Sequence, residues 1–125
     1  LSLELWSWHS LTQQALKEAL RDGRVTRFPP MDLRSGTPFQ QRVWRILRTI
    51  PPGETMTYAE VALAIHQPKA VRAVGGACGA NPIPVLIPCH RVLAVNRKIG
   101  GFSGGINWKK TLLSIEGHEA FKELF

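Results

Sequence analysis

The apolar positions of the chain are spaced for helices over most of its length. Residues 11–21, 38–50, 58–65, 69–80 and 107–116 carry apolar side chains at helical spacing or, in the third segment, nearly all round. We predict a helix in each. Proline and glycine separate these segments. One short apolar run, 83–87, has the length of a single buried strand. The chain is therefore predicted to be mainly α, within the α+β class.

Polar residues and glycines mark the expected helix ends. Side chains that can accept from a first helical turn stand at Ser10, Thr37, Thr57 and Asn107. Gln13 and Glu60 lie three positions after two of them and complete capping-box patterns. Gly23 and Gly117 are the predicted stops of the first and last helices. The interval 25–33 contains two prolines and is predicted to be an extended connector.

The segment 38–50 has one clear apolar stripe, made by Phe39, Val43, Ile46, Leu47 and Ile50. Trp44 and three arginines, at positions 42, 45 and 48, lie off that stripe. We expect them to form a solvated basic face.

Two short helices joined by a tight turn, at about 57–80, form a helix-turn-helix pattern. On the second of them Val71, Val74, Gly75 and Cys78 share an inward face, while Lys69, Arg72, Ala73 and Gly76 face outward. A helix that reads base edges normally carries several long polar side chains. Small residues with one arginine instead favour close backbone approach to DNA, with the arginine as a wedge or phosphate clamp. The competing interpretation is an amphipathic helix whose small residues allow tight packing against neighbouring helices.

The run 83–87 is stopped by Pro88, and Cys89, His90 and Arg91 follow at once. A thiol beside an imidazole and a guanidinium lies where a thiolate would be stabilised. We therefore expect the Cys89 thiol to ionise more readily than that of a free cysteine, whose pKa is about 8.5. A buried structural cysteine next to a surface histidine explains this stretch equally well.

The last helix offers a partner for the imidazole. Glu116 falls one turn after Leu112, beside the apolar face that Trp108, Leu112 and Ile115 define. A carboxylate there is costly unless it is hydrogen-bonded. His90 is the natural candidate, and a water-exposed glutamate at a helix end is the alternative. The glycine-rich stretch 100–105 matches neither a dinucleotide fingerprint nor a P-loop, and it could close over a small pocket or be a plain turn.

Composition narrows the class of partner. With 125 residues, 44% of them hydrophobic, the chain is expected to form one globular domain, without a membrane span or signal peptide. Its two cysteines do not make a disulfide framework, which favours a reducing, intracellular location in cytoplasm, nucleoid or nucleus. Sixteen Lys plus Arg against nine Asp plus Glu give a net charge of +7. This excess favours nucleic acid as partner, and an anionic membrane surface second.

Taken together, these stretches resemble the O6-alkylguanine-DNA alkyltransferases, also called methylated-DNA–protein-cysteine methyltransferases. The likeness spans about 32–117. Its motifs are Gly36-Thr37-Pro38-Phe39-Gln40, Val43-Trp44, residues 51–55, Thr57-Tyr58, residues 68–75, residues 81–92, Phe102-Ser103-Gly104-Gly105, Lys109 and Glu116-Gly117. A Pro-Cys-His-Arg-Val run behind a helix-turn-helix of this form is highly specific.

The resemblance implies a role for particular residues. Cys89 would be the nucleophile and permanent alkyl acceptor, His90 its base through a water, and Glu116 the group that orients His90. Asn81 would tie the second helix to the cysteine segment, and Tyr58 would contact the flipped guanine and its phosphate. For substrate binding it implies Ser103, the Val92 backbone, Phe102 and, in an electrostatic role, Lys109. For DNA it implies Arg72 in the gap left by the base, with Lys69, Ala70, Ala73 and Gly75 along the minor groove.

The same resemblance implies the domain division and the activity. Residues 1–35 would be a reduced or trimmed N-terminal segment and connector, and 36–125 a winged-helix-like DNA-binding and acceptor domain with a short strand leading to the cysteine. A monomer acting once, without cofactor or metal, on duplex DNA containing O6-alkylguanine is expected. An alkyltransferase-like protein that binds lesions and recruits another pathway is the alternative, and the presence of Cys89 argues against it. A transcription regulator or a cysteine hydrolase explains fewer of these features.

Overall fold

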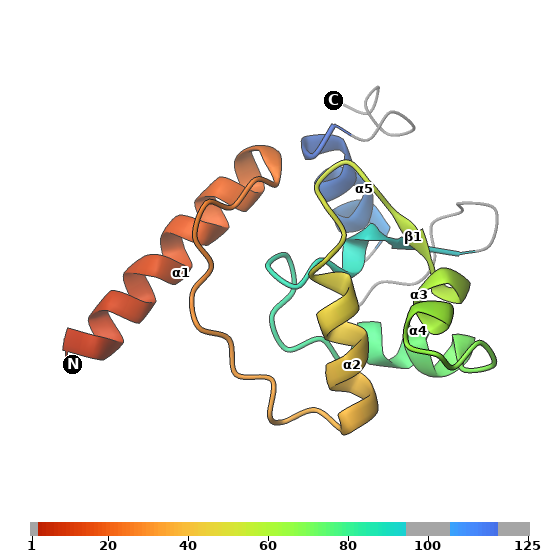
Figure 1. The fold of residues 1–125 in the computed structure, drawn as a ribbon. Coiled ribbons are helices and arrows are strands. Elements are labelled where there is room, and N and C mark those ends of the chain that lie inside the picture. Colours follow the sequence, from red (N-terminus) through yellow and green to blue (C-terminus); the bar gives the residue numbers. More distant parts are fainter. Residues whose placement is uncertain (1–2, 95–105, 118–125) are drawn as a thin grey trace.

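A computed structural model describes residues 3–94 and 106–117 (Figure 1). The described residues are mainly helical, in the order α1 (Leu3–Asp22), α2 (Pro38–Leu47), β1 (Met56–Thr57), α3 (Tyr58–Ala64), α4 (Val71–Gly79), η1 (Cys89–Arg91), β2 (Val92–Leu93) and α5 (Ile106–Ile115). The two strands form one small parallel sheet. The predicted fold class, mainly α with a small strand component, is confirmed.

The first helix begins earlier than the sequence indicated. α1 starts at Leu3, so Ser10 lies inside it and is not an N-cap; that prediction was wrong. Residues 3–9 contain neither proline nor glycine, and a helix that has already nucleated extends readily through such residues. Its end is as predicted, because Gly23 follows with a φ of +79°. The chain then runs without helix or strand to α2, as expected for the connector.

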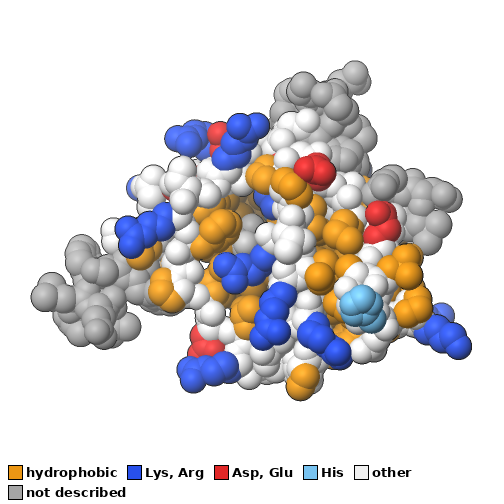
Figure 2. Space-filling model, viewed as in Figure 1, with side chains coloured by type: hydrophobic (Ala, Val, Ile, Leu, Met, Phe, Trp, Pro, Cys, Tyr) orange, Lys and Arg blue, Asp and Glu red, His pale blue; other side chains and the backbone are white. Residues whose placement is uncertain are grey.

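The cap of α2 is as predicted, but one of its faces is not. Thr37 accepts a hydrogen bond from the Gln40 amide, and Gln40 bonds back to the Thr37 amide. Trp44 was expected in solvent and is 1% exposed, because its Nε1 donates to the Ala77 carbonyl of α4 at 2.8 Å. α2 therefore packs through a wider apolar arc than the single stripe suggested. The three neighbouring arginines, at 42, 45 and 48, are exposed as expected. Blue side chains gather in the lower centre of Figure 2, where α2 lies in Figure 1.

The helix-turn-helix consists of α3 and α4, which pack against each other and against α2. The Thr57–Glu60 capping box opens α3 as predicted. The prediction that α3 is completely buried was wrong. Leu63 is 61% exposed, because only the side of α3 toward α2 and α4 is covered. On α4, Val74 and Cys78 face inward, and Arg72, Ala73 and Gly76 are exposed, as predicted.

The cysteine is reached through a loop, and the short strand comes after it. Residues 83–87 were predicted as a strand, but they form a turn in which Val85 has a φ of +78° and the Ile87 amide donates to the Ile83 carbonyl at 3.0 Å. Prolines at 82, 84 and 88 remove the donors that a strand ladder needs. β2 then pairs with β1 in parallel, Met56 beside Val92 and Thr57 beside Leu93.

The last helix presents a different face to the core from the one predicted. α5 begins one residue before Asn107, the residue expected to cap it. Trp108 was placed on the apolar face and is 57% exposed, whereas Leu112, Leu113 and Lys109 are buried. Gly117 ends the helix with a φ of +81°, as predicted. The helix lies against η1 and against α1.

Candidate active site

Cys89 lies in the main hydrophobic core at the first position of η1. It is 2% exposed and shares the core with residues of α2, α3 and α4. Its amide donates to the Ile87 carbonyl at 2.8 Å, which turns the backbone sharply after the proline. Cys78, the other cysteine, is also free and buried in the same cluster.

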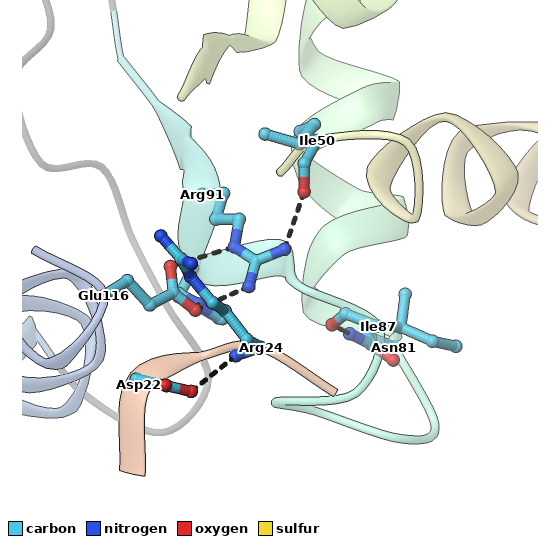
Figure 3. Close-up of polar contacts among 8 residues, drawn as sticks. Asp22, Arg24, Ile50, Asn81, Ile87, Arg91 and Glu116 are labelled. Carbon is cyan, nitrogen blue, oxygen red and sulfur yellow. Dashed lines mark hydrogen bonds and ion pairs between the residues drawn. The ribbon is translucent and has the colours of Figure 1, made fainter. Parts of the chain in front are cut away.

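Asn81 connects the end of α4 to the segment that carries the cysteine. Its Nδ2 donates to the Ile87 carbonyl at 2.7 Å, and its Oδ1 accepts from the Ile83 amide at 2.9 Å. The side chain therefore replaces the ladder hydrogen bonds that the loop 83–87 lacks. Figure 3 shows Asn81 beside Ile87. This link is the one that the family resemblance implied for Asn81.

His90 and Glu116 are paired, as the sequence predicted. The His90 Nε2 lies 2.8 Å from Glu116 Oε2, and the two side chains are 0% and 3% exposed. Glu116 follows α5 directly, while His90 belongs to η1, so the pair joins two packed elements. The other ring nitrogen, Nδ1 of His90, has no hydrogen-bond partner within the described part of the chain.

Arg91 binds the carboxylate and not the thiol, which corrects the expectation that its guanidinium lies beside Cys89. Its Nε and one terminal nitrogen donate to the two Glu116 oxygens at 2.9 and 2.6 Å. The other terminal nitrogen donates to the Ile50 carbonyl at 2.6 Å, just beyond α2 (Figure 3). Such a two-pronged contact is the preferred geometry between arginine and carboxylate. This role of Arg91 was not predicted, because adjacency to Cys89 in the sequence does not indicate in which direction a long side chain extends.

The ionisation of the thiol is also opposite to the prediction. Burial raises the pKa of Cys89 above its ordinary value, and the Asn81 side chain and the Lys109 charge oppose that rise without cancelling it. The pKa of Cys78 is raised to about 12, again chiefly by burial. Both cysteines are therefore protonated at neutral pH, so a reaction at Cys89 requires removal of its proton.

The protonation of the His90–Glu116 pair suits that task. Burial lowers the pKa of His90, although Glu116 favours its charged form. Burial would raise the pKa of Glu116, but hydrogen bonds from His90 and Arg91 outweigh it and keep the pKa below the ordinary value. At neutral pH the site then holds a neutral imidazole beside a carboxylate. With Nε2–H donated to Glu116, Nδ1 is free to accept a proton.

Lys109 is fully buried in α5, which the sequence did not predict. Its Nζ has no hydrogen-bond partner among the described residues and lies 5.6 Å from the centre of the Tyr58 ring. Burial lowers its pKa, and the same cause raises that of Tyr58 to about 12. The contact brings α5 to the start of the helix-turn-helix, beside the core that holds Cys89.

The remaining predicted residues fall in three groups. On the outer side of the helix-turn-helix, Lys69, Arg72 and Ala73 are exposed and Ala70 and Gly75 are half-buried. Val92 is fully buried in β2, next in the chain to η1. Ser103 and Phe102, together with the rest of the glycine-rich stretch, lie outside the described residues.

The described residues show neither a metal site nor a membrane span. No group of three or more His, Cys, Asp or Glu side chains that could hold a metal ion occurs within residues 3–94 and 106–117. In the same ranges, no helix combines the length and the apolar character needed to cross a bilayer.

Fold and site together define a helix-turn-helix protein with a sequestered cysteine beside an imidazole–carboxylate pair. The family described as "6-O-methylguanine DNA methyltransferase, DNA binding domain" matches residues 38–118. The chain belongs to this family.

Individual relatives agree with this assignment. The methylated-DNA–protein-cysteine methyltransferase of Haemophilus influenzae is 45% identical over 117 residues, which cover 87% of this chain and 65% of that protein. The protein of the same name from Mycobacterium tuberculosis is 52% identical over 103 residues, covering 82% and 62%. The structure of Mycobacterium tuberculosis OGT in complex with DNA superposes with a TM-score of 0.80 at 44% identity, covering 93% of this chain and 73% of that one. The chain thus spans less than two thirds of the length of these two curated relatives.

Proposed function

We propose that this chain repairs DNA by moving an alkyl group from O6 of guanine to its own Cys89, once per molecule. The observation that carries the proposal is the buried thiol of Cys89, followed in the chain by a His90 whose ring is held by Glu116, in a member of this family. A thioether has no base-labile bond, so the acceptor is not regenerated. Neither cofactor nor metal is required, because the damaged base supplies the alkyl group.

The proposed reaction begins with loss of the thiol proton. Nδ1 of His90 accepts it, through a bridging water, while Nε2 remains bonded to Glu116. The Cys89 sulfur then forms a bond to the alkyl carbon, and the bond from that carbon to O6 breaks. The electron pair stays on the guanine, where a hydrogen bond stabilises the developing charge. Burial supports this order of events: it disfavours a standing thiolate, so the charge develops when substrate is bound.

The proposed partner is duplex DNA, contacted in its minor groove by the outer side of the helix-turn-helix. Lys69 and Arg72 are its exposed cations. The small residues Ala70, Ala73 and Gly75 would let the backbone approach the duplex closely. Arg72 would occupy the gap left when the alkylated base turns out of the stack. The backbone of Val92 and the side chains of Tyr58, Ser103 and Phe102 would hold that base, with Lys109 setting the potential around it.

We further propose that residues 36–125 form the DNA-binding and acceptor domain of a monomer, with 1–35 as an N-terminal segment and connector. An intracellular location is proposed with the DNA substrate.

The test is the intact mass of the protein after mixing with duplex DNA that contains O6-methylguanine. One methyl group, about 14 Da, should appear once per molecule on the peptide containing Cys89. Cys78→Ala is the matched control, since it removes the other buried thiol and should still be methylated. Cys89→Ala should bind the same DNA without gaining mass. A methyl group on Cys78, or repeated turnover, contradicts the proposal, and binding without methylation of the wild type would favour a lesion-recognition protein.

A further inference from the structure

Glu116 is covered by the turn that ends α1. Its side chain is only 3% exposed although it follows the last residue of a helix. Gly23 lies close on this side: a Cβ placed there would lie 2.6 Å from Cγ and 2.9 Å from Oε2 of Glu116. The ribbon that carries Asp22 and Arg24 runs next to Glu116 and Arg91 in Figure 3. A side chain larger than hydrogen at position 23 would therefore collide with the Glu116 carboxylate in its present position.

The turn is held in place by its own hydrogen bonds. The Gly23 amide closes the helix on the Ala19 carbonyl at 2.9 Å, and its φ of +79° reverses the chain. Beyond it, the Thr26 hydroxyl donates to the buried Glu18 carboxylate at 2.7 Å, and the Thr26 amide donates to the same group at 3.3 Å. These bonds do not involve Glu116, so the cover is formed independently of the residue that it covers.

We propose that this turn, with Gly23 as its positioning residue, seals the Glu116–His90 pair from water. Water at this position would compete for the Oε2 acceptor and weaken the bond that orients the imidazole. Without water, Glu116 is the one acceptor for the Nε2–H of His90, and the ring keeps its Nδ1 directed away from Glu116. The N-terminal segment thus contributes to the reaction without touching the thiol. The importance of the seal for repair rests on the proposed function; its existence does not.

The test compares two glycine substitutions with the same backbone requirement. Gly23 and Gly117 have φ values of +79° and +81°, but a Cβ at Gly117 would meet nothing within 4 Å. Asparagine tolerates this left-handed conformation better than other residues with a Cβ. Gly23→Asn therefore adds a collision with Glu116 at little backbone strain, and Gly117→Asn adds the strain alone.

The readout is the exchange of the His90 Nε2 proton with water, followed by proton NMR on the full chain with ¹⁵N-labelled histidine. In the wild type and in Gly117→Asn we expect a resolved, slowly exchanging resonance. In Gly23→Asn the exchange should be at least about tenfold faster, as expected when a buried hydrogen bond is opened to solvent. Thermal unfolding of the three proteins shows how far general stability has changed.

The exchange result separates the seal from a purely structural role. Equal exchange in Gly23→Asn and the wild type overturns the inference, whatever the alkyl-transfer rates are. Faster exchange in both glycine variants overturns it too, because backbone strain alone would explain it. Should Gly23→Asn not fold, Thr26→Val decides: it removes the hydroxyl bond that holds the turn and adds no bulk at Glu116. Faster exchange there supports the seal, and unchanged exchange refutes it. Failure of methylation in the wild type with a protected proton would reject the proposed function and leave the seal standing.

Discussion

Breaking the Arg91–Glu116 ion pair should lower the free energy of unfolding more than removing an exposed charged side chain would. Arg91 and Glu116 side chains are 8% and 3% exposed, and the guanidinium makes two bonds to the carboxylate and one to the Ile50 carbonyl. Arg91→Met keeps much of the apolar stem but leaves the carboxylate with His90 alone. Removing one partner of a buried pair typically costs about 3–5 kcal/mol. We take about 3.5 kcal/mol, which is a large share of a typical domain's stability of about 5–15 kcal/mol.

Urea unfolding measures this loss. With a slope of about 2 kcal/mol per M, the midpoint of Arg91→Met should fall by about 1.8 M. Glu116→Gln leaves Arg91 without its counter-charge and should also destabilise. The double variant removes both charges, so its loss should be smaller than the sum of the two single losses by about 2 kcal/mol. Additive losses within about 0.5 kcal/mol would refute the coupling, and a loss under about 1 kcal/mol for Arg91→Met would refute the assigned burial.

Four further outcomes are expected. Asn81→Ala removes the bond that lowers the pKa of Cys89 and two loop contacts; alkylation by iodoacetamide should need a higher pH, and stability should fall by about 2 kcal/mol. Lys109→Met removes a buried amino group that has no hydrogen-bond partner among the described residues; thermal unfolding should show equal or higher stability, while Cys89 alkylation again shifts to higher pH, and unchanged thiol titration would contradict this. Burial lowers the pKa of His90 from 6.5, so the folded state binds this proton more weakly; stability should be full above about pH 6.5 and fall below it, a fall that His90→Gln should reduce in urea unfolding across pH 5 to 8. Arg72→Ala should slow methyl transfer from duplex DNA far more than from the free modified base, and equal losses would mark Arg72 as structural.

The caps of α2 and α3 could be predicted because their causes are local, whereas the pairing at the site was predicted for a different reason. Thr37 and Thr57 accept from amides three positions away, so short sequence patterns contain the whole interaction. The outward side of α4 follows from helical periodicity alone. The His90–Glu116 pair was reached by elimination, since a carboxylate beside an apolar face needs a partner and one histidine adjoins the cysteine.

The missed features depend on contacts that are distant in the chain. Trp44 is buried because α4 supplies a carbonyl for its indole, which the stripe on α2 cannot reveal. Lys109 is buried while Trp108 is exposed, because the rotation of α5 is set by α1 and η1 and not by its own apolar spacing. The pKa of Cys89 depends on the depth of the core around it, and a neighbouring arginine in the sequence carries no information on that depth.

The parallel pairing of β1 with β2 closes a loop that contains the entire helix-turn-helix and the cysteine. Met56 lies beside Val92 and Thr57 beside Leu93, so residues 58–91 are enclosed between two paired strands. Because the closing contacts are non-local, they form only when the enclosed helices are already compact enough to bring the strands together. Assembly of α3, α4 and η1 is therefore expected to be one cooperative event. In a chain that folds in this way, α4 and the core around the Cys89 thiol form in the same molecules. The molecules able to bind a partner through α4 would then also be the molecules able to react.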